Sequence, residues 1–485
     1  MRFVWITLDG AGLPLAQRLI EEGHEVIVYI ANQSCAQLYD GILPKAENLN
    51  FLAKDSERKS YIILDHVGFL KPALTLRQRV RTMGELGDHL RDLGFKVFGC
   101  NRFTERLELD RNFAKEVCEI VGIKIPRTLT FSSLQEALQL LQQNRGRWVF
   151  KPDNNVAPTY VAQEPDSSDL IMHIQTLIED KALPGQVSGV LEEYVDGVEC
   201  SLEGWYQYGD IIPGSLNITL ETKVAFPHQT GPTVGCSTSA VCPVRPSSLL
   251  FMKTLARLAG VFKRFKVTAP VDINTITPPP KGKEEPEPVF LEFCGGRFGY
   301  SAIFEFMELL ENELGQLLAD ILDKKPVTIS LKAAWGYGIR VWHPPAPWHP
   351  DDKELAKAVF KKIEGTYIFL SPRAPKEIHR HIWWQDVKLE DKNGKQLLVL
   401  VGTDGTICEI TGVGSTIPKA AAQAEYFYKF LHTEHNDHWA RLDGGQPQQY
   451  RWGVLQSWRL VAPPFKPQKV SSVSSSSADA VLTAS

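Results

Sequence analysis

The sequence contains no apolar run of about 18 residues, the shortest length that predicts a membrane-spanning helix. It also lacks an excess of positive charge. The net charge of its 485 residues is -4 at pH 7, which gives no reason to expect a nucleic-acid partner. Its eight cysteines form no CxxC pair and no zinc-ligand spacing, a pattern typical of a reducing cytoplasm. The start, MRFVWITLDG, lacks the basic segment and cleavage site of a signal peptide and predicts a first β-strand.

A chain of 485 residues is too long for one ordinary core, and about two to four domains are expected. With 43% apolar and 23% charged residues, the composition is that of a soluble globular protein. The pattern opens with a strand at 2–7, a helix at 13–24 and a strand at 25–30. This order predicts a β-α-β unit with a right-handed crossover.

The turn LDGAG between the first strand and the first helix contains Gly10 and Gly12. Amides at the N-terminus of the helix are suited to a phosphate, so these glycines are candidate substrate or nucleotide contacts. The turn is not a full GxGxxG motif, and glycines also simply permit tight turns. Both interpretations remain open from the turn alone.

The middle of the chain alternates strands and helices, with proline and glycine punctuation. A Gly/Ser/Thr-rich segment, HQTGPTVGCSTSA, predicts a loop at 228–240, and polar, proline-rich residues predict an exposed hairpin loop at 278–288. Ser132 or Ser133 is expected to cap a helix with Glu136 completing a capping box. Strands are expected near 60–68, after Pro126, and at 147–152, 189–206, 210–226, 269–277 and 288–296, and helices at 113–122, 132–144 and 247–265.

From about residue 327 the pattern changes to strands and turns, such as TISLKAAWGYG and QLLVLVGTDGTICEITGVG. The Asp-Gly pair in the second of these predicts a hairpin. A helix is expected at 417–434, and the low-complexity end SSVSSSSADAVLTAS predicts disorder.

Candidate nucleotide contacts lie on two neighbouring strands. Lys151 ends the apolar strand RWVFKP, where burial without an anion would be costly, so a phosphate is its natural partner. The alternative is a surface lysine whose stem covers apolar atoms. In VLEEYVDGVEC, Glu192 and Glu199 flank a turn whose backbone could pair with an adenine edge. The alternative is that both are solvated strand-end acids.

Asp272 and Glu292 lie on adjacent predicted strands and are candidate Mg²⁺ ligands, because Mg²⁺ takes one or two protein carboxylates and fills its shell with phosphate and water. Asp272 is otherwise a turn-flanking acid near Asn274. Arg297 could clamp a carboxylate or an acyl phosphate through two parallel hydrogen bonds, or form a surface salt bridge.

These motifs, taken in order over residues 1–445, resemble the ATP-grasp enzymes, and most closely the phosphoribosylamine–glycine ligase family. VFKP resembles the family's phosphate-lysine strand, LEEYVDGVECS its EEFLDGEEAS hinge, and LEFCGGRFG its LEFNCRFGDPE segment. ETKVAFPHQTGPTVGCSTSAVCP resembles its HK…DTGPNTGGMG loop, and RLELDRNFAKEVCEIVGIKIP its LEGSK segment. DGTICEITGVGSTIPKAAAQAEYFYKFL resembles its C-terminal hairpin and helix.

The resemblance implies an α/β protein with an ATP-grasp fold, an N-terminal Rossmann-like domain and a C-terminal β-rich α+β domain. The implied limits are 1–112 for the N-terminal domain, 113–190 for a small lid, 191–326 for the central subdomain, 327–445 for the C-terminal domain and 446–485 for a partly disordered tail. The implied activity is ATP-dependent ligation of glycine to phosphoribosylamine through an acyl phosphate, in purine biosynthesis. A cytoplasmic monomer or homodimer with small-molecule substrates and no membrane or nucleic-acid partner is expected.

Site residues follow from the same resemblance. Arg297 and Lys223 would be the catalytic residues, with Arg297 facing the acyl substrate and Lys223 near the phosphates. ATP would bind with Mg²⁺, or Mn²⁺ in its place. The ATP contacts would be Arg111, Lys151, Glu192, the backbone of Val195, Glu199 and Lys223. The substrate contacts would be Gly10, Gly12, Thr230, Gly231, Pro232 and Arg297. The metal ligands would be Asp272, Glu292 and Asn274.

The sequence departs from the family at several of these places. The LEGSK lysine is Arg111, the family's GNGGREHA loop is LDGAGLPLA, and Asp-Pro-Glu after RFG is absent. Cys294 stands where the family has a metal-binding asparagine, and a thiol is a poor Mg²⁺ ligand. Either Asp272 and Glu292 suffice with water, or Asn274 takes part, or the metal site is weakened.

The departures leave three further hypotheses: a ligase for another amine, such as a modified nucleotide or an amino-acid derivative; a degenerate, non-catalytic nucleotide-binding protein; and a Rossmann dehydrogenase, which depends only on the opening β-α-β unit.

Overall fold

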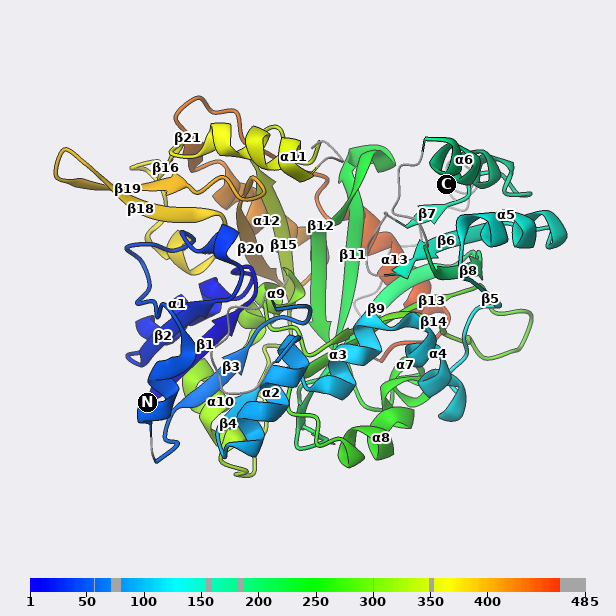
Figure 1. The fold of residues 1–485 in the computed structure, drawn as a ribbon, viewed down its shortest axis with the longest axis horizontal. Coiled ribbons are helices and arrows are strands. Elements are labelled where there is room, and N and C mark those ends of the chain that lie inside the picture. The colour runs from blue at the N-terminus through cyan, green and yellow to red at the C-terminus, as the bar shows by residue number, and fades with distance from the viewer. Residues whose placement is uncertain are drawn as a thin grey trace.

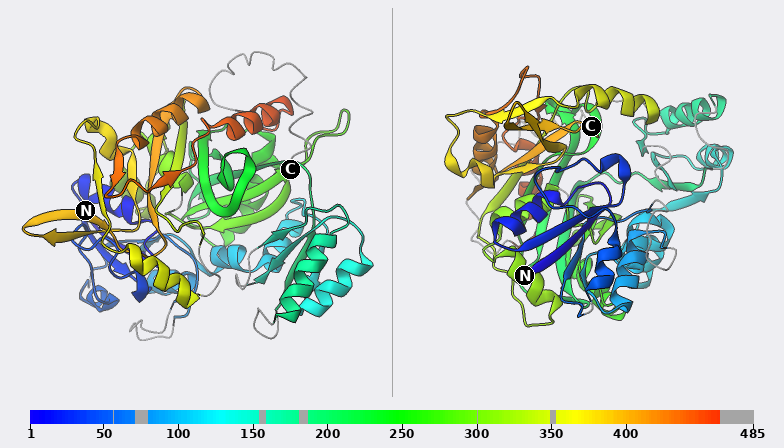
Figure 2. Two further views of the ribbon diagram at one scale, coloured as in Figure 1. Left: turned by 90° about the horizontal axis from the view of Figure 1, so that it is seen from above. Right: turned by 60° about the vertical axis from the view of Figure 1, so that its left-hand side comes forward.

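The computed structural model describes residues 1–55, 57–70, 80–153, 159–180, 187–299, 301–348 and 353–462. An N-terminal sheet and a lid sheet lie at opposite ends of the molecule, with a large antiparallel sheet between them (Figure 1). A fourth, small sheet lies beside the N-terminal domain and is formed by later residues (Figure 2). The segment predicted to be disordered, SSVSSSSADAVLTAS at 471–485, lies outside the described residues.

The N-terminal sheet is parallel and has the order β2-β1-β3-β4. The predicted β-α-β opening is confirmed, because β1 and β2 pair in parallel and α1 connects them. The elements are β1 (Arg2–Thr7), α1 (Leu13–Glu21), β2 (Glu25–Ile30), β3 (Tyr61–Leu64), α2 (Met83–Asp92) and β4 (Lys96–Phe98).

Two helices lead from this domain to the lid, and the lid has a small hydrophobic core of its own. Ser133 caps α5 by accepting from the Glu136 amide, and Glu136 binds the Ser132 amide, so the predicted capping box is confirmed with its two halves on adjacent serines. The elements are α3 (Arg102–Leu109), α4 (Arg111–Ile120), β5 (Thr128–Phe131), α5 (Leu134–Gln143), β6 (Trp148–Pro152), β7 (Tyr160–Val161), α6 (Ser168–Glu179) and β8 (Gly189–Glu193).

The central sheet runs in the order β14-β13-β9-β11-β12-β15-β20-β17, with short strands β10 and β22 beside β9 and β15. Its strands are β9 (Val198–Gln207), β10 (Asp210–Ile211), β11 (Asn217–Phe226), β12 (Thr230–Pro243), β13 (Pro270–Thr277), β14 (Val289–Gly295), β15 (Trp335–Trp342), β17 (Ile382–Trp384), β20 (Thr406–Gly414) and β22 (Trp439–Ala440). Its helices are α7 (Leu249–Lys253), α8 (Ala259–Arg264), α9 (Ser301–Leu309), α10 (Leu314–Leu322), α12 (Ile417–Tyr428) and α13 (Gln446–Ser457).

The loop predicted at 228–240 is wrong, because Thr230–Pro243 form strand β12 between β11 and β15. Small side chains suit this crowded position, since Ser237 and Thr238 are fully buried there. The predicted helix at 247–265 is interrupted at Thr254, whose backbone leaves the helical region and whose hydroxyl donates to the Leu250 carbonyl. The exposed hairpin loop between β13 and β14 is confirmed, because these strands pair antiparallel.

The hairpin predicted at the Asp-Gly pair is also wrong. Residues 404–405 carry the chain from one sheet to another, and the buried carboxylate of Asp386 fixes this turn by accepting from the amides of Gly402 and Thr403. The hairpin forms instead at Asn393–Gly394, both with positive φ, as a type I′ turn requires. The small sheet contains β16 (Tyr367–Leu370), β18 (Val387–Lys392), β19 (Lys395–Leu400) and β21 (Leu431–Thr433), with helix α11 (Lys353–Phe360) nearby.

In the part of the chain that the structure describes, no helix is both long and apolar enough to cross a membrane.

The contact between the N-terminal domain and the central sheet depends on Gly299, because a Cβ there would collide with the backbone of Ala11 and Gly12. Gly299→Ala should therefore lower the free energy of unfolding by about 1–3 kcal/mol. In α13, Gly453 has no atom near its Cβ position, and Gly453→Ala should raise stability by about 0.5–1 kcal/mol. Urea unfolding of the two variants measures this, and equal effects would contradict it.

Candidate functional site

Polar side chains line one face of the central sheet where apolar ones would be expected. Strand alternation places Glu199, Ser201 and Glu203 of β9 on the same face. The register sets Asn274 of β13 beside Ser201 and opposite Glu292 of β14. Acids at such positions are costly to desolvate unless cations or hydrogen bonds compensate them.

Lys223 supplies that compensation for two of the acids. Its Nζ lies 2.8 Å from Glu199 Oε1 and 3.4 Å from Glu292 Oε1. Asn274 Nδ2 also donates to Glu199 Oε1, at 2.8 Å. Desolvation alone would raise the pKa of Glu199, but the ammonium and the amide outweigh it and lower the pKa to about 2. Three residues predicted from separate motifs therefore meet with Asn274 on one surface.

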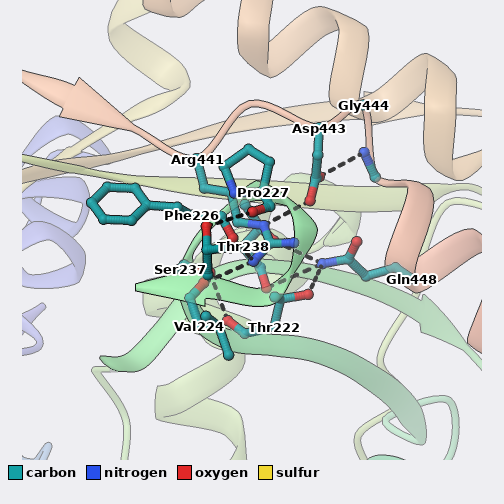
Figure 3. Close-up of polar contacts among 12 residues, drawn as sticks. Thr222, Val224, Phe226, Pro227, Ser237, Thr238, Arg441, Asp443, Gly444 and Gln448 are labelled. Carbon is teal, nitrogen blue, oxygen red and sulfur yellow. Dashed lines mark hydrogen bonds and ion pairs between the residues drawn. The ribbon is translucent and has the colours of Figure 1, made fainter. Parts of the chain in front are cut away.

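Strand β11 is irregular where it carries Lys223. The register against β12 shifts between Thr222 and Val224 and again before Phe226. The carbonyl groups released by these shifts are bound by other residues, as Figure 3 shows. The buried Arg441 donates through Nη1 to the carbonyls of Val224, at 2.9 Å, and Phe226, at 2.6 Å.

The segment around Arg441 is itself fixed. Arg441 Nε donates to Asp443 Oδ2 at 2.7 Å, and Gln448 of α13 donates to the hydroxyls of Thr222 and Thr238 (Figure 3). Residues 441–448 thus hold β11, which carries Lys223, and its neighbour β12. Helix α13 lies in the segment that the sequence assigned to a tail, and its Gln448 is fully buried.

The lid contributes a second charged cluster. Glu192 of β8 lies between two lysines, with Lys115 Nζ 2.5 Å from Oε1 and Lys151 Nζ 2.6 Å from Oε2. Desolvation would raise the pKa of this buried carboxyl, but the two lysines keep it below its usual value. Arg111, one turn before Lys115 on α4, donates to the carbonyl of Pro152. Val195 lies in the short connection between β8 and β9, where the chain passes from the lid to the central sheet.

The predicted metal ligands differ in how well they suit Mg²⁺. Asn274 Oδ1 is buried with no hydrogen-bond partner in the described part of the chain, and Glu292 lies opposite it. Oxygen donors of this kind are what Mg²⁺ prefers. Asp272 lies instead between Glu203 and Cys294, and burial beside Glu203 raises its pKa well above the usual value. No group of three or more His, Cys, Asp or Glu side chains gathers in metal-binding geometry among the described residues.

A cavity of about 730 Å³ lies between the N-terminal domain, α9 and the C-terminal strands. Arg297 lines it, with Nε 2.5 Å from Glu108 Oε1 and Nη1 3.1 Å from His66 Nε2. Gly10 also lines it, whereas the Gly12 amide is occupied by Asp65 Oδ2 at 2.8 Å. The predicted substrate residues Thr230, Gly231 and Pro232 do not line this cavity and lie at the start of β12, where Thr230 and Gly231 are exposed.

Several residues of these clusters were not expected from the sequence. Lys115 could have been found, because it follows Arg111 at the i,i+4 spacing of a predicted helix. Glu409 could have been found as an acid inside the apolar strand ICEIT, the same signal that pointed to Glu292. The role of Arg441 could not have been found from local sequence, since the two carbonyls that it binds, of Val224 and Phe226, are more than 200 residues away.

Comparison with known proteins adds to this geometry. No protein-family model matches the chain. A phosphoribosylamine–glycine ligase from Lactococcus lactis is 27% identical over 237 residues, covering 48% of this chain and 54% of the relative. One from Streptococcus pneumoniae is 27% identical over 252 residues, covering 50% and 57%. The chain is a distant homologue of phosphoribosylamine–glycine ligase. It spans only about half the length of the curated relatives it matches.

Solved structures extend the similarity to nearly the whole fold. The phosphoribosylamine–glycine ligase of Thermotoga maritima superposes with a TM-score of 0.62 at 17% identity, covering 91% of this chain and 99% of the other. A biotin carboxylase from Campylobacter jejuni gives 0.56 at 12% identity, covering 89% and 92%. An L-amino acid ligase from Bacillus licheniformis gives 0.52 at 14%, covering 89% and 98%. The predicted ATP-grasp fold is confirmed, and the dehydrogenase hypothesis is wrong.

The Lys223 cluster should make stability depend on pH. A depressed Glu199 pKa contributes stability above its unfolded value of about 4.3, and this contribution is lost as the pH falls towards 2. Lys223→Met should therefore destabilise the protein most near neutral pH. The difference in free energy of unfolding between the variant and the wild type, the gap, should narrow as the pH falls. Urea midpoints between about pH 3 and 7 measure the gap. The exposed Lys263, paired with Asp210, gives the control Lys263→Met, and a gap independent of pH would refute the effect.

Arg441→Lys should lower the free energy of unfolding by about 2 kcal/mol or more, because an ammonium cannot reproduce the guanidinium's fork of hydrogen bonds to two carbonyls and a carboxylate. Thermal or urea unfolding checks this. The exposed Arg373 gives the matched control Arg373→Lys, which should be neutral. Equal free energies of unfolding of the two variants would show that the hydrogen bonds of the Arg441 guanidinium do not contribute to stability.

Proposed function

We propose that the protein is an ATP-dependent carboxylate–amine ligase. The observation that carries this is the joint placement of two clusters, Lys115–Glu192–Lys151 at the lid and Glu199–Lys223–Asn274–Glu292 on the central sheet, in a chain with an ATP-grasp fold. Each cluster contains at least one lysine that forms ion pairs with carboxylates. The ammonium group of such a lysine is suited to binding phosphate. The relatives are phosphoribosylamine–glycine ligases, which supports the same class of reaction.

In this proposal the nucleotide binds between the lid and the central sheet. Lys151 and Arg111 contact phosphate oxygens, and Lys115 joins them because it shares Glu192 with Lys151. The Glu192 carboxylate orients both ammonium groups and accepts from the adenine amine, while the Val195 backbone pairs with the adenine edge. Glu199 binds the ribose hydroxyls, and Lys223 lies between the Glu199 carboxylate and the phosphates.

Mg²⁺ would be held by Glu292 and the Asn274 carbonyl oxygen, with Asp272 as a more distant candidate, and would neutralise charge on the phosphates when bound. Cys294 is then a neighbour of Asp272 and not a ligand. Mn²⁺ would suit the same oxygen atoms.

The chemistry requires a carboxylate substrate placed in line with the terminal phosphate. One carboxylate oxygen attacks phosphorus, ADP leaves, and an acyl phosphate forms. An amine then attacks the acyl carbon, the C–N bond forms and phosphate leaves. Arg297 is placed to orient the acyl group, because its guanidinium lines the cavity and is fixed by Glu108. Positioning and charge neutralisation supply most of the rate in such reactions.

The amine acceptor is the part most open to change. The Gly12 amide, which a phosphate would use, is already taken by Asp65, and the loop lacks the family's Arg-Glu-His. We therefore favour glycine or another amino acid as the acyl donor and an amine other than phosphoribosylamine, in a cytoplasmic monomer or homodimer. Thr230, Gly231 and Pro232 remain proposed contacts at the β11–β12 end. The position of Cys294 favours one alternative of another class, a non-catalytic nucleotide-binding protein.

ADP release tests the proposal. The purified protein is incubated with Mg-ATP, each amino acid and a set of amines that includes phosphoribosylamine generated in situ. We expect ADP release that needs both an amino acid and an amine. Release only with an amine other than phosphoribosylamine would keep the ligase and remove the purine reaction. Tight ATP binding without ADP release from any pair would support the non-catalytic alternative.

Two variants with matched controls test the clusters. Lys151→Met and Glu292→Gln should each lower kcat/KM for ATP by about 10²-fold, because each removes a charged contact to the phosphates or their metal. The exposed Lys124→Met and Glu284→Gln should leave it unchanged. Full activity in Glu292→Gln would remove the metal assignment.

A further inference from the structure

A pair of buried carboxyl groups lies at the floor of the cavity, apart from both clusters above. Glu305 of α9 is fully buried, and Glu409 of β20 is 2% exposed. They meet over Gly338 of β15, where an added Cβ would collide with Oε1 of both side chains. Glycine at 338 is therefore what allows the two carboxyl groups to approach each other.

A hydroxyl group and a guanidinium group lie next to the pair. The Ser239 hydroxyl donates to Glu305 Oε1, and Arg340 Nε lies 3.9 Å from Glu409 Oε2. Among the described residues, Glu305 Oε2 is buried without a hydrogen-bond donor. Two adjacent buried carboxylates cannot both ionise readily, so one proton is shared between them and supplies the missing donor.

The other ionisable groups around the pair do not remove this conflict. Glu221 of β11 and Cys236 of β12 face the same region, and Asp404 lies near Arg340. Arg340 is thus the cation opposite several acids. Burial, followed by the charge of Glu409, raises the pKa of Glu305 well above its usual value, which keeps the proton on the pair near neutral pH.

One member of the pair reaches the cavity. Glu409 lines it together with Arg340, Phe304 and Arg297, whereas Glu305 of α9 is fully buried and does not line it. A molecule in the cavity can therefore exchange a proton with Glu409 while Glu305 sets its basicity. No element of the proposed ATP-binding clusters contributes a residue to this pair.

We propose that Glu409, coupled to Glu305, binds the ammonium group of the amine substrate and accepts one of its protons. This rests on the proposed ligase function and gives it a substrate class, a basic primary amine that is protonated near neutral pH. Proton transfer to Glu409 frees the nitrogen lone pair, which attacks the acyl phosphate carbon. The C–N bond forms, the C–O bond to phosphate breaks, and the second nitrogen proton leaves with phosphate.

The test compares nucleophiles that differ in protonation. Acyl phosphate formed from ATP and the amino acid is captured near neutral pH by hydroxylamine, which is already uncharged, or by ammonium or methylamine, which must lose a proton. Hydroxamate and amide products are measured for the wild type, Glu409→Gln, Glu305→Gln and the exposed control Glu284→Gln.

We expect Glu409→Gln to keep hydroxamate formation within a few-fold of the wild type and to lower amide formation by about 10²-fold, the usual contribution of a general base. The remaining amide rate should rise about tenfold per pH unit, as free amine accumulates. Glu305→Gln should shift the rising limb of the amide pH profile to higher pH, because the Glu409 carboxylate then loses the acidic O–H that Glu305 donates to it.

The outcomes separate the two proposals. Absence of hydroxamate in the wild type with every amino acid would overturn the ligase function and this inference with it. Hydroxamate without any amide from ammonium or methylamine in the wild type would overturn the inference alone. Equal losses of hydroxamate and amide in Glu409→Gln would do the same, since a purely structural role affects both products alike.

Discussion

The ion pairs of Lys223 with Glu199 and Glu292 are the interaction on which the site depends. They connect β11, β9 and β14 across one face of the central sheet. A sheet that carries several acids on one face is stabilised by cations among them, because neighbouring carboxylates repel each other and are costly to desolvate without a partner. Lys223 reaches both carboxylates from an irregular part of β11, and the hydrogen bonds of Arg441 hold that irregularity in place.

The contacts of Lys223 illustrate which parts of the structure could be predicted from the sequence. Glu199, Lys223 and Glu292 were named from separate motifs, and the resemblance of those motifs in order predicted that they would meet. The wrong predictions share a cause. The Asp-Gly pair was assigned a hairpin from local turn chemistry, but Asp386, from a distant segment, binds that turn and directs it to another sheet. Strand β12 likewise depends on neighbours β11 and β15, not on its Gly/Ser/Thr composition.

The departures from the relatives concentrate on the acceptor side. Lys151, Glu192 and Lys223 keep the residue types that suit a nucleotide. At the cavity, Asp65 occupies the Gly12 amide, and the buried pair Glu305–Glu409 lies beside Arg340. A carboxylate in the cavity lining favours a cationic group on the ligand, which agrees with the proposed change of amine.

The Lys115–Glu192–Lys151 cluster of the lid also depends on compensation between buried charges. Glu192 is a buried anion that neutralises Lys115 from α4 and Lys151 from β6, and it therefore keeps two cations close together when no phosphate is between them. Two adjacent ammonium groups would otherwise repel each other and lose their positions. Because a phosphate supplies the same negative charge, these lysines can bind it without first being assembled. The free-energy cost of removing water from the two ammonium groups is therefore met during folding. Less of this cost then opposes the binding of phosphate.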